Sequence, residues 1–366
     1  MKYDAVIVGA GLSGSTAARV LAEKGKRVLV VEKLRHVAGH CHDYRNEYGI
    51  TVHTYGPHIF HTSDVVAWNF VNRFTEFHYF QHRVLSYADG QLLPFPINAD
   101  TINRVFGTSI GVDEVEAFLA SQVAHSSFAV PAKNFRDAVV SQVGARLYAT
   151  FFEQYTRKQW GRDPELLSPE VAKRIPVRTN RDGRYFSDRY QGIPARGYTA
   201  MIGAMLDHPN ISLMLGADWF ELRNDLDTGL TIFSGELDRF FDYRYGKLEY
   251  RSLDLVVKTF DTESYQDVAV VNYPNDYDWT RITEFKKFLD EKSTRTTVCF
   301  EYPKSEGEPF YIVMTDDNMS AREKYMKEVE RLEASGSWLF VGRLAEYKYY
   351  NMDQAIAATL QKVARL

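Results

Sequence analysis

Cysteine is scarce in this sequence of 366 residues, which has only Cys41 and Cys299 and no CxxC spacing. Such scarcity argues against a disulfide framework and against a structural zinc site. Cys41 lies between His40 and His42. Adjacent side chains of an extended segment point to opposite sides, so this tract suits a single ion poorly. We therefore predict a protein without a bound metal.

Long hydrophobic runs are also missing, since no stretch of about 18 consecutive apolar residues occurs. The chain passes from Met1-Lys2 directly into a strand-like run, without the apolar region of a signal peptide. The net charge of -4 provides no strongly basic surface for nucleic acid or an anionic membrane. We expect a cytoplasmic protein that binds neither nucleic acid nor membrane.

Apolar residues are plentiful, at 45%, and charged residues make up 25%, which is typical of globular proteins. A chain of this length is expected to form more than one hydrophobic core. Aromatic residues reach 14%, with 23 Tyr and 23 Phe. This content suits sugar and nucleobase pockets, and it suits a well-packed core equally well.

A strand–helix–strand unit opens the chain. The β-branched run Ala5–Val8 predicts a buried strand, and the segment Leu12–Lys24 has apolar residues at helical spacing and stops at Gly25. A second strand is expected over Arg27–Val31, ending in Glu32. Together these segments predict one βαβ unit.

The turn of this unit reads Gly9-Ala10-Gly11-Leu12-Ser13-Gly14, and Glu32 follows 23 residues after Gly9. This context is what the dinucleotide-binding fingerprint requires. Gly9 permits the tight turn, Gly11 lets the backbone approach a pyrophosphate at the helix N-terminus, and Gly14 allows close helix–strand packing. Glu32 would accept hydrogen bonds from the adenosine ribose. Lys33, followed by the small pair Ala38-Gly39, favours FAD over NAD.

The rest of the chain changes character beyond residue 100. Helices are expected over Asp113–Ala120, Phe135–Val143, Ala145–Tyr155 and Ala321–Glu333, with a last helix from about Asp353. Strands are expected over Ile211–Leu215, Thr231–Phe233, Leu253–Thr259, Val268–Tyr273, Thr296–Phe300 and Trp338–Val341. The terminal strand, glycine and helix mirror the start of the chain. They predict that the C-terminus returns to the nucleotide-binding domain.

Sequence blocks across almost the whole chain resemble the bacterial UDP-galactopyranose mutase family. The blocks are Tyr55-Gly56-Pro57-His58-Ile59-Phe60-His61-Thr62, Leu93-Pro94-Phe95-Pro96-Ile97-Asn98, Phe151 through Gly161, Arg174 through Arg178, Phe240 through Gly246, Thr280 through Glu284, Val341 through Leu344 and Tyr347 through Asp353.

The resemblance implies an α/β fold with three parts. These are a discontinuous Rossmann-like FAD-binding domain (1–80, 195–235 and 305–366), a helical domain (100–180) and an antiparallel β-sheet substrate domain (81–99, 181–194 and 236–304). A mobile loop, 162–178, is expected to carry Arg174 over the site, because Pro164, Pro169 and Pro176 interrupt a polar stretch there.

The resemblance also implies the reaction. UDP-galactopyranose and UDP-galactofuranose would be interconverted without net redox change, with N5 of reduced FAD as the covalent nucleophile on the anomeric carbon. The sequence has no convincing arrangement of a side-chain nucleophile with its base, which agrees with a reaction in which the flavin is the nucleophile. The protein then needs only to position the substrate and stabilise charge.

The site residues follow from the same resemblance, block by block. Arg174 and Arg281 match pyrophosphate-binding arginines, for which a guanidinium fork suits phosphate better than an ammonium does, and His61 matches a histidine beside the flavin ring. The three residues predicted to be catalytic are Arg174, Arg281 and His61. The predicted substrate-binding residues are Phe151, Tyr155, Trp160, Arg174, Tyr185, Asn272, Arg281, Tyr311, Tyr349 and His82. The predicted cofactor-binding residues are Gly9, Gly11, Leu12, Ser13, Gly14, Glu32, Lys33, Gly39, His40, His58, His61, Arg343, Met352 and Asp353.

Two other interpretations share the N-terminal unit. A flavin oxidoreductase of the amine-oxidase or desaturase type would oxidise its substrate with net turnover, and a flavin-bearing binding protein would have no catalysis. Neither needs this set of arginines and tyrosines. Because no second GxGxxG occurs, reducing equivalents are expected from an external donor or from NAD(P)H in the substrate cleft. UDP is an expected ligand, and we expect a homo-oligomer.

Overall fold

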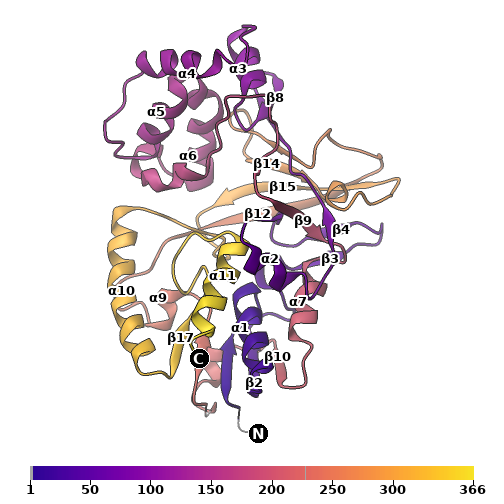
Figure 1. The fold of residues 1–366 in the computed structure, drawn as a ribbon, viewed down its shortest axis with the longest axis vertical. Coiled ribbons are helices and arrows are strands. Elements are labelled where there is room, and N and C mark those ends of the chain that lie inside the picture. Colours follow the sequence, from indigo (N-terminus) through magenta and orange to yellow (C-terminus); the bar gives the residue numbers. More distant parts are fainter. Residues whose placement is uncertain (1–2, 227) are drawn as a thin grey trace.

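The computed structural model describes residues 3–226 and 228–366, except for the side chains of Lys173 and Arg174. Three blocks follow one another along the long axis of the molecule (Figure 1). Helices α3 to α6 form one end, a large sheet that contains β12, β14 and β15 lies in the middle, and a parallel sheet with its helices forms the other end. The first and the last described segments of the chain both lie in this last block.

The parallel sheet has the strand order β10-β2-β1-β11-β17. Its strands are β1 (Ala5–Val8), β2 (Val28–Glu32), β10 (Ile211–Leu215), β11 (Thr231–Phe233) and β17 (Trp338–Phe340). Every neighbouring pair is parallel. The predicted α/β fold with a Rossmann-like unit is confirmed, and the C-terminal strand does return to the N-terminal unit.

Helices cover both faces of this sheet, because consecutive residues of each buried strand point to opposite sides. Ile7 and Val30 pack with α1 (Leu12–Glu23), α7 (Tyr198–Leu206) and α11 (Met352–Val363). Their neighbours Val8 and Val31 pack with α8 (Trp219–Leu222), α9 (Leu237–Phe240) and α10 (Asp316–Ala334). The sheet is thus the middle layer of three.

The larger sheet has the order β16-β12-β15-β14-β13-β7-β8. Its strands are β7 (Val84–Ala88), β8 (Gln91–Phe95), β12 (Tyr250–Phe260), β13 (Val270–Asn272), β14 (Arg281–Glu284), β15 (Thr296–Lys304) and β16 (Tyr311–Ile312). Only the pair β13–β7 is parallel, so the sheet predicted to be antiparallel is mixed at this one junction. Between β8 and β12 the chain passes through the helical block and part of the parallel sheet, so no hairpin fixes the direction of β13 relative to β7.

Two smaller sheets join these parts. β3 (Asp43–Arg45) pairs with β4 (Thr51–His53), and β9 (Tyr190–Pro194) lies between β5 (Phe60–Thr62) and β6 (Phe77–Tyr79). Helix α2 (Val65–Val71) follows β5 directly. The β5–β9 pairing sets His61 opposite Gln191, which brings two distant segments together.

The helical block differs from its prediction in three places, the first of which is α3, a helix that was not predicted. It contains α3 (Ala99–Phe106), α4 (Val115–Ala124), α5 (Phe135–Tyr148), a π turn (Ala149–Glu153) and α6 (Gln154–Trp160). The two helices expected on either side of Gly144 are one element with a kink at that residue, where φ is 80°. A Cβ on Gly144 would lie 2.8 Å from Gln122 Cβ of α4, so glycine is needed where the helices touch. The predicted polar loop contains two 3₁₀ turns, Pro164–Leu166 and Pro169–Arg174.

Helix α7 was not predicted, since its sequence, YTAMIGAML, has no polar face to reveal a helical period. In the described part of the chain, every helix is too short or too polar to span a lipid bilayer.

Candidate functional site

Two adjoining hollows occupy the region where the three blocks meet. The inner cavity, of about 500 Å³, runs along the N-terminus of α1 and the ends of β1, β2 and β11. The outer cleft, of about 1890 Å³, runs between the helical block, β13, α2 and α11. Both are lined by His61, Tyr155, Tyr185, Phe186, Asn272, Tyr349, Tyr350 and Asn351. They therefore open into one another and form one site with two ends.

The glycine turn forms the floor of the inner cavity. Gly9 has φ 102°, and a Cβ on Gly14 would lie 2.0 Å from the Gly9 carbonyl oxygen, so close packing fixes both positions as glycine. A Cβ on Gly11 would meet only Gly39 Cα, at 3.9 Å. Helix α1 has no side-chain cap and no acidic residue in its first turn. Its N-terminal N–H groups and dipole are thus available to an anion in the cavity.

Glu32 closes the side of this floor. Its Oε2 accepts the backbone N–H of Ala10 at 2.7 Å, and its Oε1 accepts that of Leu34 at 2.8 Å. These bonds hold the buried carboxylate at the cavity wall with lone pairs left for a ligand hydroxyl. The geometry is compatible with the predicted ribose contact.

Glu308, which the sequence did not suggest, reaches into the inner cavity from the far side. Its Oε1 lies 3.0 Å from His40 Nε2 and 3.8 Å from Lys33 Nζ. The hydrogen bond from His40 is the main cause that lowers the pKa of Glu308, while burial lowers the pKa of His40. The pair links the nucleotide-binding turn to the loop between β15 and β16.

Two predicted cofactor-binding residues, Gly14 and Asp353, line neither hollow, because each is occupied by a contact within the protein. Gly14 is covered by the Gly9 carbonyl. Asp353 Oδ2 accepts the Thr62 hydroxyl at 2.7 Å, which ties α11 to β5. The assumption that His40-Cys41-His42 is extended is also wrong, because Gly39–Cys41 forms a 3₁₀ turn. Among the described residues, no group of three or more His, Cys, Asp or Glu side chains could hold a metal ion.

The other predicted cofactor-binding residues line the inner cavity. They are Gly9, Gly11, Leu12, Ser13, Glu32, Lys33, Gly39, His40, His58, His61, Arg343 and Met352. The predicted substrate-binding residues His82, Tyr155, Tyr185, Asn272, Arg281, Tyr311 and Tyr349 line it too, whereas Phe151 and Trp160 line the outer cleft. The backbone of Arg174 ends a 3₁₀ turn, and its side chain lies outside the described part of the structure.

Arg281 is the cation of the substrate end. Its Nε donates to Glu301 Oε2 at 2.7 Å, and its Nη2 donates to the Tyr311 hydroxyl at 3.1 Å. Burial lowers the pKa of Arg281, but the fully buried Glu301 carboxylate outweighs this and raises it above its ordinary value. Arg281 therefore stays charged, with N–H groups left to donate. Glu301 was not predicted, because its spacing from Arg281 matches no motif.

Aromatic rings surround this cation. The ring centroids of Trp160, Tyr311 and Tyr349 lie 6.3 to 6.4 Å from one another. Burial raises the pKa of Tyr155 and of Tyr311, so both hydroxyls remain protonated donors. Such rings offer flat apolar faces, and their hydroxyl groups can bind phosphate oxygens.

Two further cations hold the end of α6 in place. Arg251 Nε donates to the carbonyl oxygen of Gln159 at 2.9 Å. Lys158 Nζ lies 2.5 Å from the carbonyl oxygen of Tyr273 and 2.8 Å from that of Tyr277. These contacts fix Trp160 at the outer cleft. Neither Arg251 nor Lys158 could be recognised from sequence, since their partners belong to distant segments and are mostly backbone carbonyls.

Three histidines, His58, His61 and His82, line the inner cavity and form what we call the histidine wall. His61 stacks on Phe186 with centroids 3.6 Å apart and an angle of 11° between the planes. Burial lowers the pKa of His58 to about 4 and that of His82 to about 3, so both rings are neutral at physiological pH. His82 Nδ1 is buried and has no hydrogen-bond partner among the described residues. A bound group could supply one.

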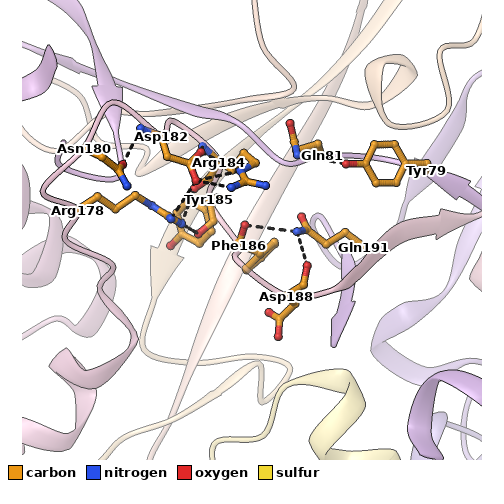
Figure 2. Close-up of polar contacts among 10 residues, drawn as sticks. All are labelled: Tyr79, Gln81, Arg178, Asn180, Asp182, Arg184, Tyr185, Phe186, Asp188 and Gln191. Atoms are coloured by element: carbon orange, nitrogen blue, oxygen red, sulfur yellow. Dashed lines mark hydrogen bonds and ion pairs between the residues drawn. The ribbon is translucent and has the colours of Figure 1, made fainter. Parts of the chain in front are cut away.

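The segment from Arg178 to Gln191 packs against this wall, and Figure 2 shows how it is braced. Arg178 bonds the Asp182 carboxylate at 3.3 Å and the carbonyl oxygen of Arg184 at 2.8 Å. Gln191 Nε2 donates to the carbonyl oxygens of Phe186 and Asp188. The segment thus presents Phe186, which was not predicted, beside the predicted Tyr185.

These residues fit a dinucleotide cofactor on three observations. The α1 N-terminus is uncapped, the space above Gly11 is open, and His82 Nδ1 lacks a partner within the described chain. The first two suit a pyrophosphate, and the third suits a polar ring edge farther along the cavity.

Comparison of the sequence with known proteins supports this interpretation of the site. The family model of UDP-galactopyranose mutase matches residues 150–349, and that of an NAD(P)-binding Rossmann-like domain matches residues 7–74. A probable UDP-galactopyranose mutase of Klebsiella pneumoniae is 40% identical over 362 residues, covering 97% of this chain and 92% of that protein. A dTDP-fucopyranose mutase of Escherichia coli is 37% identical over 367 residues, covering 97% of this chain and 96% of that protein.

Solved structures share the fold. A reduced UDP-galactopyranose mutase superposes with a TM-score of 0.78 at 16% identity, covering 100% of this chain and 94% of that chain. A redesigned putrescine oxidase gives 0.57 at 13% identity, covering 100% of this chain and 99% of that chain. Both structures show the fold alone. The family model, which matches more than half of the chain, and the two relatives that match nearly its full length indicate the mutase family rather than the oxidase. This chain belongs to the UDP-galactopyranose mutase family, which is FAD-dependent, and it is a mutase for the pyranose and furanose forms of a nucleotide sugar.

Proposed function

We propose that this protein interconverts UDP-galactopyranose and UDP-galactofuranose in its reduced, FAD-bound state. The observation that carries the proposal is Arg281, a half-buried guanidinium with spare N–H groups that lines the inner cavity with Tyr155, Tyr311 and Tyr349. This arrangement suits a sugar nucleotide whose pyrophosphate lies at Arg281. Its sugar would face the inner cavity, and its base would face the aromatic outer cleft.

FAD would lie along the inner cavity. The α1 N-terminus and Gly11 would receive its pyrophosphate, Glu32 would receive the adenosine ribose, and His58, His61 and His82 would surround the ring system. Bound in the reduced state, the flavin would supply the nucleophilic nitrogen that the anomeric carbon needs. We also propose the three domains expected from the sequence, with two changes to their predicted bounds. Helix α9 packs on the parallel sheet and so belongs to the FAD-binding domain, and β16 belongs to the mixed sheet of the substrate domain.

The protein's own part is to hold the leaving pyrophosphate close while the anomeric bond is broken. Arg281 would stabilise the charge that develops on that phosphate, and the Tyr311 and Tyr349 hydroxyls would donate to its oxygens. Trp160 and Phe151 would cover the base and exclude water from the cleft. Arg174 keeps its predicted role as a second pyrophosphate-binding arginine.

A second candidate substrate is dTDP-fucopyranose, because the E. coli relative carries that name at nearly the same identity. It differs from UDP-galactopyranose by a methyl group on the base, by the missing ribose 2′-hydroxyl and by a methyl group in place of the sugar's C6 hydroxymethyl. A polar group placed to bind a substrate hydroxyl rejects an analogue that lacks it more strongly than an apolar pocket does. Kinetics with both substrates are therefore expected to separate them clearly.

The test uses dithionite-reduced holoenzyme with UDP-galactofuranose and, in parallel, with dTDP-fucofuranose. Products are resolved by chromatography. We expect conversion of the UDP sugar with a higher kcat/KM, without stoichiometric loss of reductant, and no conversion by rigorously oxidised enzyme. A higher kcat/KM for the dTDP sugar would mean that the dTDP sugar, and not the UDP sugar, is the substrate. Net oxidation of either sugar would favour an oxidoreductase instead.

A further inference from the structure

Asp188 lies against His61 at the rim of the site. Its Oδ2 is 2.8 Å from His61 Nδ1. Its Oδ1 accepts the Ser63 hydroxyl at 2.9 Å. Asp188 lines the outer cleft, while His61 lines both hollows. The carboxylate is therefore engaged on both oxygens, and one of them holds the histidine.

The segment that carries Asp188 is held at its backbone as well. Gln191 Nε2 donates to the Asp188 carbonyl oxygen at 2.9 Å, as Figure 2 shows, and Gln191 is the β9 residue that faces His61 of β5 across the strand pair. Phe186 of the same segment stacks on the imidazole face. Carboxylate, ring and strand pairing thus fix the imidazole from three directions.

A carboxylate only accepts hydrogen bonds, so Nδ1 of His61 must carry the proton that it donates to Asp188. In the neutral ring the other nitrogen, Nε2, is then an acceptor. Since Nδ1 is occupied and one face is covered by Phe186, Nε2 is the nitrogen that His61 can offer to a group bound in the site. The tautomer follows from the contact with Asp188.

We propose that Asp188 is a positioning residue that fixes His61 in the Nδ1–H tautomer, so that Nε2 carries a proton between sugar hydroxyls during the ring interconversion. This inference rests on the proposed function. An aspartate that accepts from the far nitrogen of a general-base histidine both selects the tautomer and stabilises the imidazolium that forms.

The reaction supplies a proton to move. Conversion of pyranose into furanose transfers the ring bond at the anomeric carbon from O5 to O4, and it transfers one proton from the O4 hydroxyl to O5. No electron is gained or lost by the sugar over the whole reaction. His61 Nε2 would take the proton from O4 and return it to O5, and the reverse reaction uses the same path.

The structure provides a matched control. His78 Nε2 lies 3.3 Å from Asp290 Oδ2, and this pair lines neither hollow. His78 lies on β6, which pairs with the same strand β9. Asp290→Asn is therefore the same substitution at a His–Asp pair whose histidine lies in the same sheet, outside the site.

The experiment compares the parent holoenzyme, Asp188→Asn, Asp188→Ala, His61→Ala, His61→Ala/Asp188→Asn and Asp290→Asn, with UDP-galactofuranose as substrate. We expect both Asp188 variants to lose kcat about 100-fold with KM changed less than about threefold, because general acid–base catalysis typically contributes about 10²–10⁴. Asp290→Asn should turn over like the parent. The double variant should be no slower than His61→Ala, because Asp188 acts through His61. Parental kcat in both Asp188 variants, or an additive loss in the double variant, would overturn the inference.

Nitrogen-15 NMR of histidine-labelled parent enzyme tests the tautomer without any turnover. The His61 signals among the ten histidines are assigned by their loss in His61→Gln. A protonated Nδ1 and a bare Nε2 support the inference, and a proton on Nε2 overturns it even where an Asp188 variant fails to fold. If the parent converts neither sugar nucleotide, the proposed function fails and the proton-carrying role fails with it. The NMR result then still decides what Asp188 does to His61.

Discussion

The two ends of the site are built by different means. At the cofactor end, backbone groups of one short segment, from Gly9 to Gly14, form the floor, and glycine is required there by contacts as close as 2.0 Å. At the substrate end, side chains from β14, β15, β16, α6 and the Arg178–Gln191 segment converge from distant parts of the sequence. A cavity floor made of backbone groups tolerates few substitutions. It can recognise only a group that many ligands share, such as a pyrophosphate. A wall of side chains can be changed singly, and it can therefore set which sugar nucleotide is bound.

The largest effect is expected at the substrate end, from Arg281→Ala. This change removes the cation at the proposed pyrophosphate position and leaves the buried Glu301 carboxylate without its partner. Truncating one member of such a pair costs about 2–5 kcal/mol, so kcat/KM should fall by about 30- to 5,000-fold. Steady-state kinetics with UDP-galactofuranose measure this. The double variant Arg281→Met/Glu301→Gln should recover thermal stability but not activity, and parental activity in Arg281→Ala would mean that the pyrophosphate binds elsewhere.

Gly14→Ala tests the cofactor end as a packing element. The added Cβ would stand 2.0 Å from the Gly9 carbonyl oxygen, so the turn must shift. Overpacking of this kind destabilises a protein by about 1–3 kcal/mol or more. Gly203→Ala is the matched control, because Gly203 is also helical and a Cβ there would have no neighbour within 4 Å. It should be neutral or slightly stabilising. Urea unfolding of both variants gives the comparison, and equal stabilities would contradict it.

Gly11→Ala sharpens the same contrast within one turn. Gly11 has φ -77°, which alanine adopts freely, and its Cβ would meet only Gly39 Cα at 3.9 Å. The cofactor-free protein should therefore unfold like the parent. FAD affinity, measured by titration of flavin fluorescence, should fall about 10-fold, because the methyl group occupies the path of the pyrophosphate. Unchanged affinity would place the pyrophosphate away from this turn.

His82→Asn concerns the histidine wall of the inner cavity, and its effect depends on pH. Burial lowers the pKa of His82 to about 3 in the folded protein, so the unfolded chain binds the extra proton between about pH 6.5 and pH 3. Stability from this group is present above pH 6.5 and is lost as the pH falls. Between pH 7 and pH 5 the loss should be about 2 kcal/mol. In His82→Asn, urea unfolding at the two pH values should differ by that much less than in the parent. The same slope in both proteins would mean that the pKa of His82 is the same in the folded and the unfolded chain.

Some of this protein could be predicted from local sequence. The turn at Gly9, Gly11 and Gly14 is a matter of backbone sterics within a few residues, and the strands on either side show their burial in composition. The α/β fold and the return of the C-terminal strand followed from these patterns. The kink at Gly144 and helix α7 did not, because each depends on what packs against it.

The remaining features were decided by the tertiary structure alone. Residues that match the family's motifs could be named without it, but their partners could not. Asp188 and His61 are 127 residues apart, and Arg251 and the Gln159 carbonyl are 92 residues apart. Neither spacing has a period, and nothing local distinguishes Asp188 from a solvated carboxylate. Only the pairing of β5 with β9 brings that carboxylate to the imidazole, because strand pairing is set by burial of whole faces rather than by any single residue. The sequence by itself determined which groups are available, and the fold decided which of them act together.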